Sequence, residues 1–268
     1  MSENEQAIQE FSKLTKEQQR EYLKKQEQER NEKVAMYEEK ALDACLNDID
    51  ALVGYLKVAG RFERLSVPNT LLIYAQKPDA TVLMTFDGWK KHRVNIKKDS
   101  EGILLRKRVS TGTYMSGGEV KEGYAFKPYY VFDVTQTDCR PEPEQKIPIP
   151  ILCKAFDELV SDTFEAEPVE ADSDGSNLSM MIYSYEYTLL TNNKSEDANF
   201  KACLATISIC SASHITAHKD IFTALELELN RFRDAKKPLK NALIESKIMS
   251  GTFEEKLLVS IKKVLESM

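Results

Sequence analysis

Within the first 80 residues, a polar stretch is followed from residue 42 by apolar residues that recur with a helical period. Thr15 and Gln18 form a capping-box pattern, which predicts a helix that begins near Lys16. Few apolar residues occur in the first part of this helix, so we expect residues 1–40 to form a charged helical extension. Between residues 42 and 56 the apolar positions lie three and four apart, which predicts an amphipathic helix with one face on a core.

A second apolar segment, from Ser66 to Pro78, predicts another helix. Ser66 is a favourable N-cap residue, and Pro68 lies in the first turn, where its missing N–H group costs no hydrogen bond. Asn69 and Gln76 are polar residues within this apolar segment. One interpretation is that they satisfy backbone groups at the helix ends. The other depends on a family resemblance and is given below.

Two strands are predicted next, at residues 103–109 and 129–134, which are rich in apolar, β-branched and aromatic residues. The glycines between them predict a flexible hairpin tip. Thr85 is expected to cap a short helix that carries Trp89, the only tryptophan. Because helices precede an antiparallel sheet, the expected fold class is α+β, with residues 41–140 as one domain.

The second half is predicted to be a mainly helical domain over residues 151–268. Residues 141–150 contain four of the nine prolines, so we expect an extended linker and a domain boundary there. Methionine and tyrosine alternate with other residues between 178 and 190, which predicts one small β element, a strand or a hairpin. Helices are expected at residues 151–160, 200–212, 222–232 and 253–265.

Charge is distributed unevenly along the chain. The net charge is −6, yet residues 87–108 contain eight lysines and arginines against three acidic residues, a local charge of +5. Residues 151–268 contain 13 basic and 19 acidic residues, so charge repulsion makes this half a poor partner for a polyanion. A nucleic acid would therefore meet the first half. His92 lies within the basic run and is expected to contact a phosphate or a base.

Four segments of the first half resemble the N-terminal domain of ArdC-type antirestriction proteins, in particular the LtrC-like proteins of conjugative elements. They are residues 69–80 (N-T-L-L-I-Y-A-Q-K-P-D-A), Trp89, residues 94–103 and residues 131–137 (V-F-D-V-T-Q-T). The resemblance covers roughly residues 42–138 and implies a non-catalytic domain that binds single-stranded DNA. Asp99 stands where the family has a glycine, which is expected to change the turn and to subtract positive charge.

The resemblance and the basic run together predict a surface for single-stranded DNA. Lysine and arginine side chains would follow the phosphates, and aromatic rings would stack on unpaired bases. Trp89 either serves as such a ring or belongs to the core. Of Tyr129 and Tyr130, at most one can stack, because neighbouring strand residues point to opposite faces. The predicted DNA-binding residues are Asn69, Gln76, Trp89, Lys90, Lys91, Arg93, Lys97, Lys98, Arg106, Lys107, Arg108 and Tyr129.

The resemblance also implies a second domain, which relatives of this type often build on the motif H-E-x-x-H, in which the histidines bind zinc and the glutamate activates water. The segment at residues 200–210 is similar to the motif helix, with Thr206, Ile207 and Cys210 where His, Glu and His would stand. These side chains supply no general base. In this alignment the metal ligands are missing as well.

A second segment, His214 to His218, keeps the spacing of the two histidines but has Ile215 at the glutamate position. Isoleucine cannot accept a proton from water, so the chemistry of the motif cannot run. We therefore expect a degenerate, zincin-like second domain that has a structural role, without catalytic residues, metal ligands or cofactor.

Three functional hypotheses remain open. The first is a single-stranded-DNA-binding accessory protein of a mobile element, with a role in antirestriction. The second is a protein–protein interaction module that binds a partner through the N-terminal helix or the acidic C-terminal half. The third is a metal-dependent hydrolase with His214 and His218 as ligands. The chain has no apolar run of about 18 residues, no signal-peptide pattern and no C-x-x-C pair among its five cysteines, so we expect a cytoplasmic protein without membrane contact.

Overall fold

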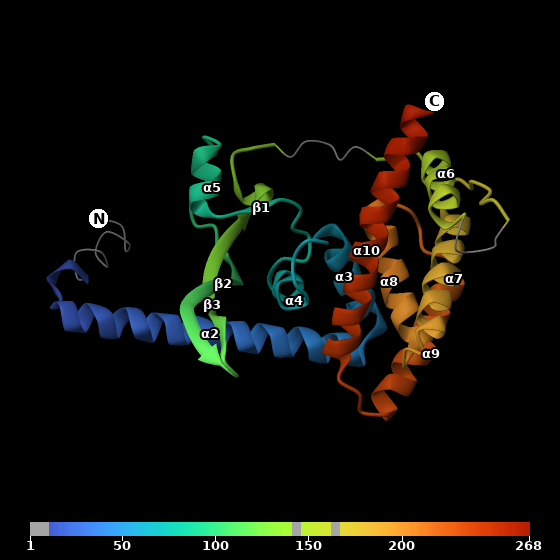
Figure 1. The fold of residues 1–268 in the computed structure, drawn as a ribbon. Helices are drawn as coiled ribbons and strands as arrows, with labels where there is room; N and C mark the ends of the chain where they lie inside the picture. The colour runs from blue at the N-terminus through green and yellow to red at the C-terminus, as the bar shows by residue number, and fades with distance from the viewer. Residues whose placement is uncertain (1–10, 141–145, 162–166) are drawn as a thin grey trace.

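The computed structural model describes residues 11–140, 146–161 and 167–268 (Figure 1). A long N-terminal helix and two shorter helices precede a small antiparallel sheet, and a group of packed helices forms the second half. The fold is therefore α+β, as the sequence predicted. Within the described residues, none of the helices combines the length and the apolar character needed to cross a membrane.

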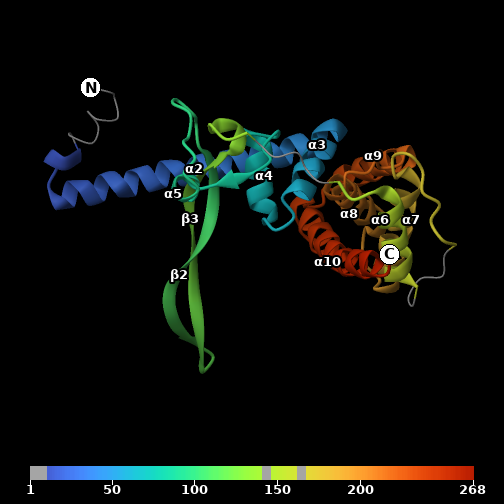
Figure 2. The same cartoon turned by 90° about the horizontal axis from the view of Figure 1, so that it is seen from above.

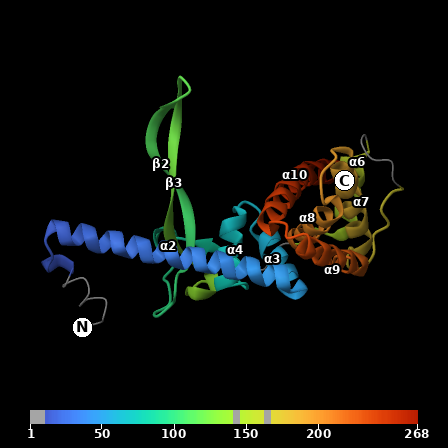
Figure 3. The same ribbon diagram turned by 90° about the horizontal axis from the view of Figure 1, so that it is seen from below.

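Helix α2 (Lys16–Asn47) begins where the sequence predicted. The N–H group of Gln18 donates to the Thr15 hydroxyl at 3.3 Å, and the N–H group of Thr15 donates to the Gln18 side chain at 2.9 Å. Val34 is the first of its described residues to be buried. The N-terminal part of α2 therefore projects away from the rest of the molecule (Figures 2 and 3).

The apolar stripe predicted as one helix over residues 42–56 is divided at Asp48, so that prediction is wrong. The backbone of Asp48 is extended, with φ −135° and ψ 122°, and helix α3 (Ile49–Arg61) begins after it. The Asp48 carboxylate accepts the Asp50 N–H group at 2.9 Å. A short carboxylate of this kind competes for backbone donors, which explains why it ends one helix and caps the next.

Two shorter helices, α4 (Val67–Gln76) and α5 (Phe86–Lys91), lie where the sequence predicted them. Pro68 occupies the first turn of α4, and Ser66 stands at the N-cap position but its side chain makes no cap hydrogen bond. The Thr85 hydroxyl accepts a backbone N–H group of the first turn of α5 at 3.1 Å. The short strand β1 (Leu83–Met84) directly precedes this cap.

The sheet has three antiparallel strands in the order β1–β3–β2, where β2 is Ile103–Ser116 and β3 is Glu119–Asp133. The flexible tip predicted between residues 109 and 129 is wrong, because both strands continue through this segment as a paired ribbon. Only Gly117 and Gly118 form the turn, and both have positive φ, as in common two-residue hairpin turns. The hairpin consequently extends far from the helices (Figures 2 and 3).

The second half is helical, as predicted. Helices α6, α8, α9 and α10 overlap the predicted ones, although α10 begins well before residue 253. The five helices are α6 (Ile149–Val160), α7 (Ser176–Asn192), α8 (Ala198–Ser213), α9 (Lys219–Asp234) and α10 (Leu239–Glu266).

The β element predicted at residues 178–190 is wrong, because this segment belongs to helix α7. Leu178 and Ile182 are buried one helical turn apart and place this side of the helix on the core. Tyr183 and Tyr187, which suggested alternation, stack on each other along the helix with ring centroids 6.1 Å apart. The described part of the second half contains no strand.

Helix α8 is the centre of the helical half, since every residue from 200 to 210 is buried. Helices α3, α7, α9 and α10 pack around it. Gly60 allows the close approach of α3, because a Cβ atom there would overlap the Ser208 carbonyl oxygen. One hydrophobic cluster contains residues from both sides of the predicted linker at residues 141–150. The predicted domain limits stay predictions, and residues 141–145 lie outside the described residues.

Candidate nucleic-acid interface

The side chains of Asn69 and Gln76 bind the edge of strand β2. The Asn69 amide accepts the Arg106 N–H group and donates to the Arg106 carbonyl oxygen, both at 2.9 Å. The Gln76 amide makes the same pair of bonds with Leu104, at 2.9 and 3.0 Å. Seven positions apart, the two residues share one face of α4 and replace a missing neighbouring strand. They therefore satisfy backbone groups, at a strand edge rather than at helix ends, and are not offered to DNA.

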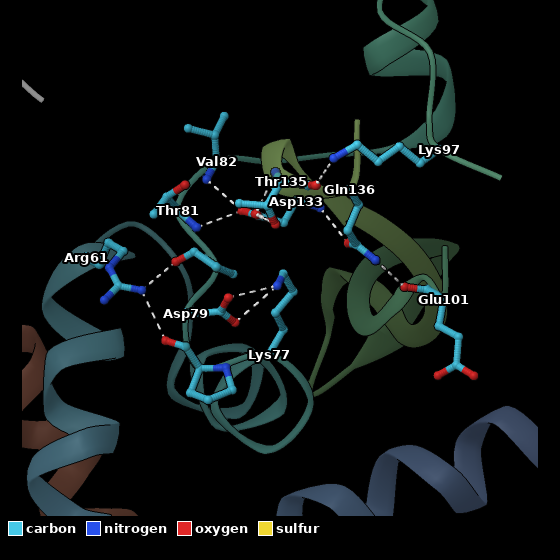
Figure 4. A network of polar contacts seen from close by, with 12 residues as sticks. Arg61, Lys77, Asp79, Thr81, Val82, Lys97, Glu101, Asp133, Thr135 and Gln136 are labelled. Atoms are coloured by element: carbon cyan, nitrogen blue, oxygen red, sulfur yellow. Dashed lines mark hydrogen bonds and ion pairs between the residues drawn. The ribbon is translucent and has the colours of Figure 1, made fainter. Parts of the chain in front are cut away.

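Asp133, at the end of β3, joins segments that are distant in sequence (Figure 4). Its buried carboxylate accepts the N–H groups of Thr81 and Val82 at 2.7 and 3.0 Å, and the N–H and hydroxyl groups of Thr135 at 2.9 and 2.6 Å. Burial alone would raise the pKa of Asp133, but these hydrogen bonds to the charged form outweigh it and lower the pKa. The segment at residues 131–137 is thus a structural element of the sheet.

Trp89 lies inside the protein, with 4% of its surface exposed. Its indole N–H group donates to the Phe132 carbonyl oxygen at 2.9 Å and so fixes α5 against β3. A buried indole with a satisfied N–H group is typical of a core residue. Of the two interpretations of Trp89, the structure therefore agrees with the core residue and not with a base-stacking ring.

Five predicted cations lie exposed on α5 and on the segment after it: Lys90, Lys91, Arg93, Lys97 and Lys98. Lys97 is held in place, because its ammonium group donates to the Thr135 carbonyl oxygen at 2.8 Å (Figure 4). His92, at the end of α5, is also exposed. This end of the sheet is therefore the more strongly basic part of the candidate interface.

Asp99 adopts the backbone conformation that a glycine takes most easily. Its φ is 62°, in the left-handed region, where aspartate and asparagine are tolerated better than most other residues. The Ser100 N–H group donates to the Lys97 carbonyl oxygen at 3.3 Å and closes the turn. Asp99 thus keeps a glycine-like turn, and its remaining effect is one negative charge beside Lys97 and Lys98.

Arg106 is bound to the long N-terminal helix. Its guanidinium group forms an ion pair with Glu38 of α2 at 2.9 Å, and Lys240 of α10 contacts the same carboxylate. Glu38 is buried, so removing Arg106 would weaken the compensation of a buried charge. Arg106 therefore has a structural role, unlike its predicted role as a DNA ligand.

Lys107 and Arg108 are exposed on the outer part of the hairpin, residues 107–130, which we call the hairpin arm. The Lys107 ammonium lies 5.8 Å from the centre of the Tyr129 ring. The Arg108 guanidinium lies 3.2 Å from the centre of the Tyr124 ring. Both are cation–π arrangements, which position a cation without neutralising it.

The aromatic residues of the arm differ in their exposure. Tyr129 is half-buried against the smaller hydrophobic cluster, and burial raises its pKa. Tyr130 points to the other face of the strand and is 41% exposed, so Tyr130, and not the predicted Tyr129, is available for stacking. Sequence reasoning missed Tyr124 and Phe126, which are 44% and 66% exposed. Their alternate spacing with Tyr130 was the signal that could have found them.

The residues that resemble the zinc motif do not assemble a metal site. Thr206, Ile207 and Cys210 are buried within α8, and burial raises the pKa of Cys210 to about 12. His214 ends α8, whereas His218 precedes α9 and its Nδ1 atom accepts a backbone N–H group of that helix at 3.2 Å, so the two histidines do not share a helix. Across the described ranges, no group of three or more His, Cys, Asp or Glu side chains is arranged to hold a metal ion.

A cavity of about 450 Å³ is lined by residues from the ends of α3 and α8 and from α10. Glu63, Glu254 and His214 contribute to its lining. Burial and the neighbouring Glu63 carboxyl raise the pKa of Glu254 to about 9, so Glu254 is neutral at pH 7. Burial also lowers the pKa of Lys247 to about 8, although its ammonium donates to the Ala59 carbonyl oxygen at 2.8 Å. These two shifts make the stability of the helical half depend on pH.

No protein-family model matches the chain, and no curated protein gives a significant match. Two solved structures are similar to it, both of the antirestriction protein ArdC from plasmid R388. The Mn(II)-bound structure aligns with 84% of this chain and 97% of its own, with a TM-score of 0.51 and 12% identity. The metal-free structure aligns with 74% and 86%, with a TM-score of 0.48 and 15% identity. The resemblance seen in the sequence is thus confirmed at the level of structure, and the chain has an ArdC-type fold.

Proposed function

We propose that this protein is a non-catalytic accessory protein of a mobile or conjugative element that binds single-stranded DNA and acts in antirestriction. The observation that carries the proposal is the set of exposed cations at residues 90–98 and 107–108, in a chain whose net charge is −6. The protein with a similar fold, ArdC of plasmid R388, is an antirestriction protein. That description supports the biological context of the proposal.

In the proposed complex, the exposed cations neutralise phosphates and release counterions. The logarithm of the affinity then falls with the logarithm of the salt concentration, by about 0.7 for each phosphate contacted on a single strand. Exposed aromatic rings favour unpaired bases over a duplex. Because Asn69, Gln76, Trp89 and Arg106 are bound within the protein, we leave them out of the proposed surface.

We propose further that the helical half is structural and has no catalytic metal. The R388 protein has been observed with Mn(II). Here Thr206, Ile207 and Cys210, at the positions that resemble the zinc motif, supply no set of charged ligands. The lack of a three-ligand group among the described residues supports the same conclusion.

A protein–protein interaction module is the second candidate. The outer end of the hairpin arm favours it, because Tyr114, Met115 and Val120 are 55%, 67% and 69% exposed. Met115 and Val120 are cross-strand partners on one face, and neighbouring apolar side chains exposed to this extent indicate a contact surface, whereas Tyr114 lies on the opposite face. In this alternative the basic residues would bind an acidic partner, and affinity for DNA would not depend on the number of strands.

Fluorescence anisotropy with labelled oligonucleotides of about 20–30 nucleotides tests the proposal, using single-stranded and duplex DNA at two salt concentrations. We expect tighter binding to the single strand and weaker binding at the higher salt concentration. Lys90→Glu/Lys98→Glu should weaken binding and reduce the salt dependence by about 0.7 per lost contact. Asp99→Gly retains the turn, removes one negative charge and should tighten binding slightly.

The matched control is Lys219→Glu/Lys262→Glu, which changes the net charge equally at two exposed positions of the helical half. This variant should bind like the unmodified protein, because it lies outside the proposed surface. Absence of binding at low salt concentration would contradict the proposal and favour the protein-partner alternative. Equal affinity for single-stranded and duplex DNA would also contradict it.

A further inference from the structure

The hairpin arm is a two-stranded ribbon with little support along its edges. Side chains of α4 cover the edge of β2 only as far as Arg106, and β1 pairs with β3 only at Phe132 and Asp133. Among the described residues, no third strand pairs with the arm. An isolated two-stranded hairpin is marginally stable in water. A long arm that exposes large apolar side chains is therefore best explained as a binding surface.

Three aromatic rings share one face of this arm. Tyr124, Phe126 and Tyr130 occupy alternate positions of β3, and alternate residues of a strand point to the same side. Phe126 lies directly opposite Arg108, which places the guanidinium group on the same face. The exposed fractions of the three rings, 44%, 66% and 41%, show that this face is open to solvent.

Charge distinguishes the inner part of the arm from its tip. Residues 106–110 and 124–130 contain four basic residues and no acidic one, whereas residues 111–123 contain two acidic residues and one basic residue. Arg106 and Lys127 form ion pairs with Glu38 and Glu27 of α2, so the attraction of a polyanion to the inner part depends on Lys107 and Arg108. Of these two, Arg108 lies on the face of the three rings. Positive charge would attract a nucleic acid or an acidic protein alike. The exposed rings beside it favour a nucleic acid, because they can stack on unpaired bases.

The rings differ in how much of their surface a base could use. The Arg108 guanidinium already covers one face of the Tyr124 ring, 3.2 Å from its centre. The Phe126 ring is 66% exposed and is the most open of the three to a base. The Tyr130 ring packs closely on Gly102, since a Cβ atom at that glycine would lie 2.9 Å from the ring. A ring backed in this way is already ordered before a base arrives.

We propose that bases of single-stranded DNA stack on the face of the hairpin arm formed by Tyr124, Phe126 and Tyr130, with Arg108 between them and the phosphates. This inference rests on the proposed function and replaces Trp89 and Tyr129 as stacking residues. Gly102 connects the two parts of the interface, because it lies against Tyr130 and follows the turn that carries Lys98 by four residues. The bound DNA strand thus runs from the cations near α5 onto the inner part of the hairpin arm.

The test compares the affinity of ring variants for labelled single-stranded oligothymidylate by fluorescence anisotropy. Phe126→Ala and Tyr130→Ala should each weaken binding roughly 5- to 150-fold. Phe126→Trp keeps a ring at the same place and should retain the affinity. Tyr114→Ala removes an exposed ring from the opposite face of the arm and should change little. Circular dichroism and thermal unfolding confirm that each variant is folded.

Photo-crosslinking with oligonucleotides that contain 5-bromodeoxyuridine provides a second measurement. The crosslinked peptide should include residues 124–130. If the unmodified protein binds single-stranded DNA but the ring variants bind equally well, or if crosslinks form only at Trp89, the inference is overturned and the proposed function stands. If the unmodified protein does not bind single-stranded DNA, both are overturned.

Discussion

The sheet region is stabilised by other interactions than the helical half. In helix α8, eleven consecutive residues are buried, and side chains pack on all sides. In strand β2, only the first three residues are buried, and most of the strand is exposed. The sheet instead depends on polar side chains that complete its backbone hydrogen bonds, chiefly those of Asn69, Gln76 and Asp133.

This difference explains why the segments that resemble the family contain sheet-supporting residues and not the exposed rings. The segments at residues 69–80 and 131–137 contribute Asn69, Gln76 and Asp133, which bind backbone groups and define the sheet. The exposed rings of the hairpin arm lie outside these segments. The motifs therefore specify the fold more directly than the binding surface, and a similar fold can carry a different set of contact residues.

The largest expected effect separates the helical core from the arm. Phe200 is completely buried in α8, so Phe200→Ala should lower the free energy of unfolding by about 3–5 kcal/mol, through lost burial and a remaining cavity. Phe126→Ala removes a similar ring from an exposed position and should change it by less than about 0.5 kcal/mol. Urea unfolding followed by circular dichroism measures both. Similar losses for the two variants would contradict the comparison.

A smaller effect is expected from the polar side chains that support the sheet. Asn69→Ala leaves the N–H and carbonyl groups of Arg106 without these partners and should lower the free energy of unfolding by about 1–3 kcal/mol. Asn31→Ala, at an exposed position of α2, is the control and should be neutral or slightly stabilising. Urea unfolding again provides the measurement. An unchanged stability for Asn69→Ala would show that water replaces the amide at this edge.

The smallest expected effect is on the pH dependence of stability, which arises from buried titratable groups of the helical half. Folded protein keeps the Glu254 proton up to about pH 9, whereas the unfolded chain releases it near the ordinary glutamate value, so stability falls as pH rises between these values. Glu254→Gln should reduce this slope by up to about 1.4 kcal/mol per pH unit. The interval from pH 7 to pH 8 isolates Glu254 best. Glu186, with a pKa of about 7, lowers stability with rising pH mainly below this interval, and Lys247, with a pKa of about 8, raises stability with rising pH mainly above it.

Glu255→Gln is the control for this experiment, because the neighbouring glutamate is exposed. Urea unfolding at pH 7 and pH 8 gives the slope for each variant. The Glu255→Gln slope should match that of the unmodified protein. A slope that Glu254→Gln leaves unchanged would mean that Glu254 loses its proton at a lower pH in the folded protein.

Local sequence was sufficient where the decisive interactions are close in the chain. The capping box at Thr15, the cap at Thr85 and Pro68 in the first turn of α4 all act on backbone within a few residues, although the Ser66 side chain makes no cap hydrogen bond. The prediction of one helix over residues 42–56 failed because the apolar period continues through Asp48, whose carboxylate caps a new helix. At residues 178–190 the alternating tyrosines concealed a helical stripe of buried residues.

The candidate site was only partly predictable for a similar reason. The sequence located the cations near α5 and on β2, because charge is a property of composition. It could not show that Arg106 is paired with Glu38, since the two residues are far apart in the chain. It also could not show that Trp89 is buried, because a tryptophan in a short amphipathic helix is compatible with either environment.

By itself, the sequence determined the α+β class, the position of most helices, the basic run and the resemblance that the ArdC-type fold confirms. These features depend on local periodicity, local hydrogen bonds and composition. Only the tertiary structure decided which polar residues support the sheet, how far the hairpin extends and which rings are exposed. Those properties depend on contacts between residues that are distant in sequence, and no local pattern encodes the solvent exposure that results.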